Sequence, residues 1–317
     1  MKPSLNNLVA VLVSLAWVAT SHSSPALVIG SFDYSRSGHI SFSSGDYFQQ
    51  ARTSLVAHFT QVTFTSFPTL TSSNLACVNL LVIAAGTTIS TPGAPLSTSE
   101  QLAVLDYVQR GGAALILHDN YSFSPTAPAE QEALIAPFGM HGYGTVGGAG
   151  TAVVVAPQAH PVTSGRFGSV SSFCQVYAGA LTNLGPFGYA LAANTLGIAL
   201  AVIEGGAIAP ASGRVVIFSD GNSFADPGVG CFSANEALFL NAVDWSTRPT
   251  LRIQRGQPHV TLLWRTTTPD CILEASLSLG ETASWQPVTN AVTVTDCQSV
   301  VAEVPAGGAR FYRLRCQ

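Results

Sequence analysis

One stretch near the middle of the chain, Leu105–Asn120, runs from a helix through a buried strand to a polar turn. We expect the helix to end at a Gly-Gly pair, and the residues that follow it, Ala113–Leu117, are all apolar. A short apolar run bounded by turn residues is typical of a strand buried on both faces, as in a parallel sheet. The run stops at three polar residues, His118, Asp119 and Asn120. In an open α/β sheet ligands bind at the carboxyl ends of the strands, so a functional site is expected at this turn.

The same alternation of apolar runs and helical periodicity recurs from residue 26 to residue 246. The other apolar runs are Ala26–Phe32, Val78–Ala84, Leu196–Ile203 and Arg214–Phe218. Helical spacing of apolar residues is found in Tyr47–Phe59, in the segment after the capping box Ser97–Glu100, in Ala129–Phe138 and in Asn235–Trp245. Strands that alternate with helices predict an α/β fold with a doubly wound, mostly parallel sheet of the flavodoxin-like kind.

The pattern changes after residue 247, where short segments of alternating residues are separated by turns. These segments are Leu251–Gln254, Val260–Trp264, Cys271–Ala275, Val292–Thr295, Val300–Val304 and Phe311–Leu314. Several short strands at this spacing predict a small all-β sandwich. We therefore expect a signal peptide over residues 1–23, an α/β domain over 24–247 and a β-sandwich module over 248–317.

The N-terminus has the features of a secretory signal. Lys2 supplies a positive charge, Leu8–Ala19 is a short apolar run, and small residues follow at a cleavage position. The run is too short for a membrane span, which needs roughly 20 residues; a retained anchor is the alternative. The sequence thus predicts a secreted or periplasmic protein with no membrane span after cleavage.

Charge and motifs exclude several classes of partner. The formal net charge is −4, which does not provide the basic face that nucleic-acid binding needs. There is no phosphate-binding loop of the Walker type, and the glycines between residues 139 and 150 do not form a dinucleotide fingerprint. We expect no nucleic-acid partner and no cofactor.

The chain has six cysteines, an even number that favours disulfides behind a signal peptide. None of them has the CxxC spacing of a zinc or redox site. The preferred pairs are Cys174 with Cys231 and Cys271 with Cys297. Cys77, which precedes a buried strand, is expected to remain an inert thiol in the core.

Seven polar residues at or just after predicted strand ends are candidate ligand-binding residues. They are Asp33, His39, His118, Asp119, Asn120, Asp220 and Asn222. Carboxylates and an imidazole that meet in one cleft could bind a polyhydroxylated ligand or a divalent metal. The alternative is that these residues cap the following turns and helices, as Asp and Asn commonly do.

Two further residues suggest catalysis. Ser223 lies in Gly221–Ala225, which superficially matches the serine elbow of hydrolases, but the only later histidine is His259 in the predicted second domain. His160 precedes a proline, which favours a structural histidine in a stiff turn over a general base.

Three stretches together resemble a known family: YVQRGGAALILHDN, the HPVTSG segment at His160–Gly165, and GRVVIFSDGNSF followed by NEALFLNAVDW. In this order they resemble the glutamine-amidotransferase-like domains of exported bacterial proteins, including the ThuA-like and related uncharacterised families. That superfamily uses a Cys-His-Glu triad with the cysteine at the turn after the central strand. Here the matching turn, His118–Tyr121, contains no cysteine, so the resemblance implies a domain that has kept the fold and lost the nucleophile.

The C-terminal segment, with LLWRTTTPDCILEAS and a closing FYRL, resembles β-sandwich modules of secreted proteins of the Verrucomicrobia and Planctomycetes type. These resemblances imply a non-catalytic role in binding or scaffolding, with a carbohydrate or an extracellular protein as partner. The alternative is a secreted enzyme, either a hydrolase that uses Ser223 or a metal-assisted sugar-processing enzyme that uses the strand-end cleft.

Overall fold

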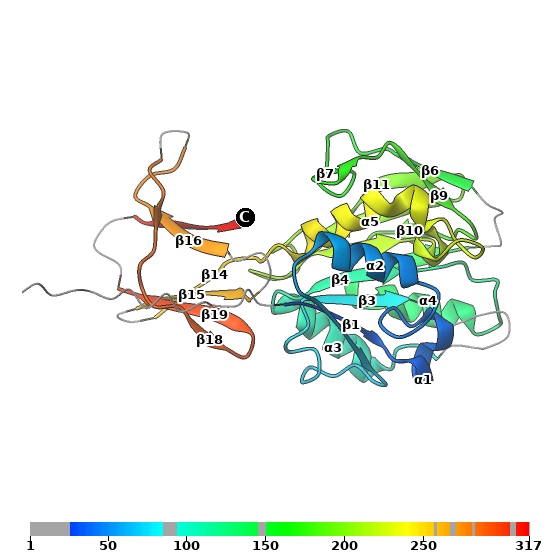
Figure 1. The fold of residues 1–317 in the computed structure, drawn as a ribbon, viewed down its shortest axis with the longest axis horizontal. Helices are drawn as coiled ribbons and strands as arrows, with labels where there is room; N and C mark the ends of the chain where they lie inside the picture. Colours follow the sequence, from blue (N-terminus) through cyan, green and yellow to red (C-terminus); the bar gives the residue numbers. More distant parts are fainter. Residues whose placement is uncertain are drawn as a thin grey trace, which may run out of the picture.

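The computed structural model describes residues 26–84, 94–144, 150–256, 259–266, 271–280, 283–304 and 309–316. The predicted signal peptide lies outside these residues. Figure 1 shows two groups of elements side by side. We call residues 26–247 the α/β part, and the strands from residue 252 onward the C-terminal sheets. Among the described residues, no helix has the length and apolar character that crossing a membrane requires.

Five strands of the α/β part are parallel and lie in the order β2-β1-β3-β4-β13. They are β1 (Leu27–Phe32), β2 (Val62–Phe67), β3 (Leu80–Ala84), β4 (Ala113–Leu117) and β13 (Val215–Phe218). Every residue of β3, β4 and β13 is buried. The continuous apolar runs therefore correspond to strands covered on both faces, as the sequence predicts.

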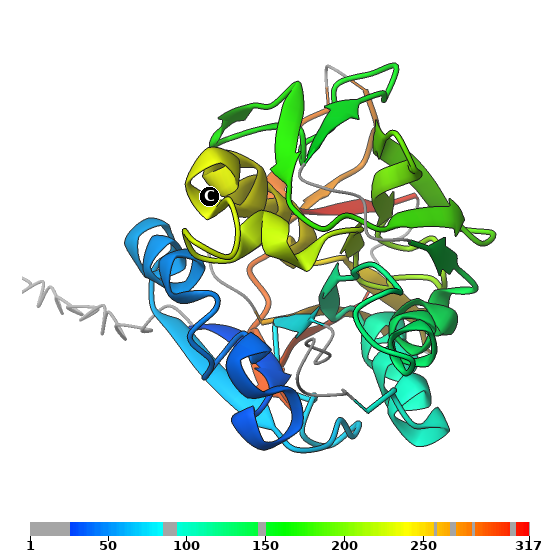
Figure 2. The ribbon, with the colours of Figure 1, turned by 90° about the vertical axis from the view of Figure 1, so that its right-hand side faces the viewer.

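Helices cover both faces of these strands. Leu115 and Leu117 of β4 pack in one cluster with α2 (Gln49–His58) and α5 (Phe232–Thr247). Ala114 and Ile116 face the other way, into a cluster with α3 (Thr98–Gln109) and α4 (Ala127–Ile135). Figure 2 shows the two helix layers on opposite sides of the sheet. The shorter helical turns are α1 (Tyr34–Ser37), η1 (Gly38–Ile40), η2 (Ala136–Phe138) and η3 (Gly221–Phe224).

The ends of α3 follow directly from its sequence. Ser97 accepts a hydrogen bond from the backbone N–H of Glu100, and the Glu100 side chain caps in return, which is the predicted capping box. At the other end Gly111 has φ +91°, a conformation that side chains rarely adopt. A Cβ at Gly112 would meet the Tyr107 ring at 2.3 Å. The glycine pair thus ends the helix and turns the chain into β4.

The other half of the sheet is antiparallel. Beyond β13 the order continues β12-β11-β6-β9, and β10 pairs with both β12 and β5. The bounds are β5 (His141–Tyr143), β6 (Gly150–Val154), β9 (Ser172–Gln175), β10 (Ala180–Asn183), β11 (Gly188–Asn194) and β12 (Gly197–Ile203). A separate small ribbon joins β7 (Ser164–Gly165) and β8 (Gly168–Ser169).

The prediction of a mostly parallel sheet did not anticipate this half. The antiparallel arrangement follows from the short connection between β11 and β12. There Asn194 Oδ1 accepts hydrogen bonds from the N–H groups of Leu196 and Gly197. A connection this tight joins strands as a hairpin, and hairpin strands are antiparallel. The central sheet is therefore mixed.

The C-terminal sheets are antiparallel, in the orders β14-β15-β19-β18 and β17-β16-β20. Their strands are β14 (Arg252–Arg255), β15 (Val260–Arg265), β16 (Cys271–Ser276), β17 (Gln286–Pro287), β18 (Thr293–Thr295), β19 (Gln298–Glu303) and β20 (Phe311–Cys316). Leu262, Trp264 and Val301 of one sheet share a buried cluster with Leu273 of the other. Trp264 is therefore a core residue.

The junction between the α/β part and the C-terminal sheets is held by polar and covalent contacts. Arg265 of β15 donates through Nη2 to the carbonyl oxygens of Leu75, Ala76 and Val78, at 3.3, 2.7 and 2.5 Å. Asn79 donates to the carbonyl oxygen of Thr266 at 2.8 Å. All of these contacts converge on the turn that precedes β3.

Three disulfides account for all six cysteines. Cys174 bonds to Cys231, as expected, but Cys271 bonds to Cys316 and Cys77 bonds to Cys297. The predicted Cys271–Cys297 pair is wrong because β16 and β20 pair in a register that places Cys271 directly opposite Cys316. The prediction of an inert Cys77 thiol is also wrong, because this residue lies at the junction and forms a bond across it.

Candidate functional site

The carboxyl ends of β3, β4 and β13 surround a small hollow, which we call the strand-end hollow. It has about 260 Å³ of empty space, including its open mouth. The polar residues that line it are Tyr47, Asp119 and Asn222, and apolar groups such as Phe48 and Ala84 complete the wall. The hollow thus lies at the edge of the sheet that the sequence analysis singled out.

Asp220 is a buried carboxylate that shapes this edge. Its Oδ1 accepts from the N–H of Asn222 at 2.9 Å, and its Oδ2 accepts from the N–H of Val176 at 2.6 Å and from the Ser223 hydroxyl at 3.4 Å. Burial raises the pKa of Asp220 to about 6, although these hydrogen bonds oppose the shift. Asp220 therefore caps η3, as the capping alternative held.

Asp119 is held from one side only. Its Oδ1 accepts from the backbone N–H of Asn120 at 2.7 Å and from the Asn120 amide at 3.3 Å. Its Oδ2 makes no hydrogen bond to any residue that the structure describes; a Cβ built on Gly221 would lie 3.7 Å from it. Burial and the Asp220 carboxylate raise the pKa of Asp119 well above its usual value. Two neighbouring strand ends thus bring a pair of interacting carboxyl groups together, one of which lines the hollow.

His118 points to the opposite side of the sheet from Asp119. The residue is fully buried, and neither ring nitrogen has a hydrogen-bond partner in the described part of the chain. Its ring lies 5.6 Å from that of Tyr121, and a Cβ at Gly142 would lie only 2.6 Å from Nε2. Burial lowers the pKa of His118 to about 4, so the imidazole is neutral at pH 7. It belongs to the packed layer under α4 and does not line the strand-end hollow.

Asn120 and Asn222 serve mainly as turn formers. Asn120 Oδ1 accepts from the backbone N–H and hydroxyl of Ser122, and its amide donates to the carbonyl of Tyr177. The Asn222 amide donates to the carbonyl of Val229 at 2.7 Å. Of these two predicted residues, only Asn222 lines the hollow.

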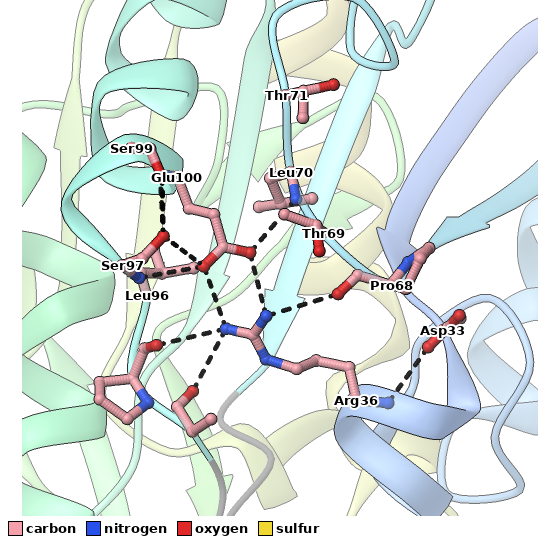
Figure 3. Close-up of polar contacts among 12 residues, drawn as sticks. Asp33, Arg36, Pro68, Thr69, Leu70, Thr71, Leu96, Ser97, Ser99 and Glu100 are labelled. Carbon is pink, nitrogen blue, oxygen red and sulfur yellow. Dashed lines mark hydrogen bonds and ion pairs between the residues drawn. The ribbon is translucent and has the colours of Figure 1, made fainter.

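Asp33 and His39, the other predicted residues, make local contacts outside the lining of the hollow. Asp33 accepts from the backbone N–H of Arg36 and so caps α1, which orients Arg36 toward Glu100 (Figure 3). The Arg36 guanidinium bonds both carboxylate oxygens of the buried Glu100, at 3.0 and 3.2 Å. His39 is exposed and pairs with Asp46 at 2.8 Å. In these contacts Asp33 and His39 stabilise local structure and do not contribute to the hollow.

Neither catalytic suggestion from the sequence has a reactive geometry. Ser223 is fully buried and donates its hydroxyl to the carbonyl of Cys174 at 3.0 Å. His160 packs edge-on against Trp245, accepts from the N–H of Val162 and lies 3.3 Å from Glu204. Within the described residues, no group of three or more His, Cys, Asp or Glu side chains could hold a metal ion.

Two further residues shape this edge and were not predicted from the sequence. Gln131 of α4 is fully buried and accepts from the backbone N–H of Asp119 at 2.8 Å, which fixes the start of the turn. Tyr47 lines the hollow from the segment before α2. Tyr47 begins a segment that the sequence identified only as a helix, and nothing in its spacing indicates which side of the sheet it covers.

Comparison with known proteins gives a limited result. No protein-family model matches the chain, and no curated protein matches it. Similar solved structures include a glutamine amidotransferase from Methylobacillus flagellatus, with 10% identity and a TM-score of 0.43 over 70% of this chain and 94% of that one. A ThuA-like protein from Parabacteroides merdae has 12% identity and a TM-score of 0.40 over 71% and 90% of the two chains.

A third similar structure is the β-galactosidase from Rahnella sp. R3, with 11% identity and a TM-score of 0.44. The match covers 89% of this chain and 41% of the β-galactosidase. Similarities this weak carry no argument about what this chain does.

Proposed function

We propose that this chain is an exported bacterial protein that binds a small polyhydroxylated ligand, such as a terminal sugar, at the mouth of the strand-end hollow, with one hydroxyl reaching inside, and does not convert it chemically. The observation that carries the proposal is the Asp119 carboxylate: it lines the hollow, and its Oδ2 makes no hydrogen bond to a described residue. This oxygen can accept a hydrogen bond from a ligand hydroxyl, and the protonated form of the carboxyl group, which the raised pKa of Asp119 favours, can also donate one. The partly exposed ring of Tyr47 in the same wall provides apolar surface for one face of a sugar ring.

The same edge lacks a described nucleophile. The turn after β4 carries His118, Asp119 and Asn120 in place of a cysteine or serine, and each of the six cysteines is in a disulfide. Ser223 is buried against a backbone carbonyl. These features support an amidotransferase-like domain that holds a ligand and has no attacking group among the described residues of this edge.

The remaining elements support export and attachment. Disulfides persist in oxidising compartments, and this chain has three of them. Together with the predicted signal peptide they favour a secreted or periplasmic location. The C-terminal sheets then form a β-sandwich module that attaches the α/β domain to its surroundings.

A glycan array followed by calorimetry on the best binder tests the proposal. In Asp119→Asn the Oδ1 contacts to Asn120 can persist, whereas the oxygen at Oδ2 is replaced by an amide group that can only donate. We expect affinity to fall by roughly 10-fold, the usual cost of one lost hydrogen bond. Asp33→Asn is the matched control, since Asp33 ends β1 and does not line the hollow, and its affinity should be unchanged. Equal binding by Asp119→Asn and the parent would contradict the proposal.

One observation favours a second candidate, a sugar-processing enzyme. Asp119 and Asp220 both have raised pKa values, and a carboxyl pair that shares a proton can act as acid and base. Mass spectrometry of the bound glycan after long incubation distinguishes the two: a cleaved glycan indicates the enzyme, and an intact glycan the binding protein.

A further inference from the structure

A second hollow lies at the junction between the α/β part and the C-terminal sheets, and its lining is basic. This junction hollow has about 290 Å³ of empty space, including its open side. Arg110 from the end of α3, Arg252 of β14 and Arg265 of β15 line it, and none of the described residues that line it is an aspartate or glutamate. Gln109, Thr250 and Gln298 add further polar side chains. The wall therefore combines three positive charges with neutral hydrogen-bonding groups.

Two buried polar atoms of this wall have no partner. Arg265 is only 6% exposed, and its Nε has no hydrogen-bond partner within the described residues. The same holds for Oγ1 of Thr250. A buried polar group without a partner costs free energy, so in native proteins such groups usually meet a ligand, an ion or a water. Both atoms can donate, which fits an acceptor-rich ligand.

Arg265 is already oriented by the fold. Its Nη2 is fixed on the carbonyls of Leu75, Ala76 and Val78, and its guanidinium lies 5.0 Å from the centre of the Tyr107 ring. Because these contacts hold the plane of the group, an anion that binds Nε pays little ordering entropy.

The negative groups near the hollow do not neutralise it. Asp106 pairs with Arg110 at 2.9 Å, but that arginine is 61% exposed, so the pair is largely solvated. The α3 carbonyls of Asp106, Tyr107 and Val108 accept backbone N–H groups, so this helix end does not present unbonded carbonyls from those residues. Arg252 contacts the neutral amide of Gln254. A positive charge thus remains at the hollow although the whole chain has a net charge of −4.

We propose that the junction hollow binds a tetrahedral oxyanion, sulfate or phosphate, either free or as an ester on a larger molecule. Arginine's planar set of N–H donors matches such oxyanions, which accept several hydrogen bonds at once. The hollow shares no lining residue with the strand-end hollow, so the two sites are independent of each other. An anion here would contact Arg110 of the α/β part, Thr250 of the segment that joins the two parts, and Arg252 and Arg265 of the C-terminal sheets.

Calorimetric titration of the full chain with sodium sulfate and sodium phosphate, at constant ionic strength, tests the proposal. Calorimetry is preferred to melting because sulfate raises the stability of most proteins without binding them. We expect saturable binding by the parent chain and a loss of roughly 10-fold or more in affinity in both Arg110→Gln and Arg252→Gln. Arg255→Gln is the matched control, because Arg255 lies on the same strand as Arg252 but does not line the hollow.

Glucose 6-sulfate and glucose 6-phosphate form the second arm. Tighter binding of an ester than of its free ion identifies an ester group as the ligand, and equal or weaker binding identifies the free ion. The absence of saturable binding of all four probes would overturn the proposal. Binding that Arg110→Gln and Arg252→Gln leave unchanged, or that Arg255→Gln weakens equally, would overturn it as well.

Discussion

Arg265 provides the most direct test of how the two parts of the molecule are joined. We predict that Arg265→Met lowers the free energy of unfolding by about 2 to 4 kcal/mol. Methionine retains most of the apolar stem, so the change mainly removes the guanidinium. Arg265 donates to three backbone carbonyls. The Leu75 carbonyl also accepts from the N–H of Val78. The carbonyls of Ala76 and Val78 have no second donor among the described turn and side-chain hydrogen bonds.

The magnitude follows from these contacts. The buried Val78 carbonyl that loses its donor costs about 1 to 3 kcal/mol. The Ala76 carbonyl is only partly buried, so water can replace the donor and its loss costs less than about 1 kcal/mol. Loss of the cation–π contact with Tyr107 at 5.0 Å adds about 1 kcal/mol. Burial of the Arg265 charge is itself unfavourable, as its lowered pKa indicates. Removing that charge recovers part of the loss, which places the lower end of the range near 2.

Urea unfolding at pH 7, followed by tryptophan fluorescence, measures the change. The matched control is Arg313→Met, because Arg313 is 46% exposed and Arg315 remains to pair with the shared Glu274. Arg313 also lies 4.3 Å from the centre of the Trp285 ring, so this control loses a cation–π contact as Arg265→Met does. Exposed ion pairs and exposed cation–π contacts are each weak, and the control should cost no more than about 1 to 1.5 kcal/mol. If Arg265→Met costs no more than Arg313→Met, the reasoning about buried carbonyls at the junction is refuted.

Three further predictions concern the α/β part. Burial raises the pKa of Asp220 to about 6, so its ionisation opposes folding and its contribution to stability is lost as pH rises from about 4 through 6. The pKa of Asp119 is raised as well, by burial and by the Asp220 carboxylate; Asp119→Asn should therefore unfold at higher urea than the parent at pH 8 and show no gain at pH 4. Hydrogen bonds from Arg36, Ser97 and Leu70 outweigh burial and lower the pKa of Glu100, so its contribution is complete at neutral pH and is lost as pH falls below about 4. Glu100→Gln should cost about 2 to 4 kcal/mol in urea unfolding at pH 7 and much less at pH 3, and an equal cost at both values would argue against the ion pair. A fluorophosphonate probe should leave the folded chain unlabelled, since the Ser223 hydroxyl is buried; labelling that Ser223→Ala abolishes would restore the hydrolase hypothesis.

The elements that could be predicted from sequence are those whose signal is local. β4 has the predicted bounds, Ala113–Leu117, because its apolar run is bounded by a glycine pair and by polar residues. The start of α3 follows from Ser97 and Glu100, which lie three residues apart and cap each other. In both cases neighbouring residues determine the structure.

Features that depend on distant partners could not be predicted in this way. The Cys77–Cys297 bond spans 220 residues, and nothing local to either cysteine identifies the other. The predicted site included residues that do not line the hollow, for a similar reason. Strand ends meet at one edge of a sheet, but this rule does not say on which face each side chain lies. The alternation of side chains along β4 indicates the face of each residue. Continued two residues beyond Leu117, it places His118 on the α4 side of the sheet and Asp119 on the opposite side.

The order in which the cysteines leave the ribosome has a consequence for biogenesis. Cys77 emerges first, and its partner Cys297 follows only after Cys174, Cys231 and Cys271 have passed. During synthesis Cys77 therefore meets three incorrect thiols before the correct one exists. A host that makes this protein efficiently needs a thiol isomerase to undo early mispairing, and truncation before residue 297 leaves Cys77 available for crosslinking between chains.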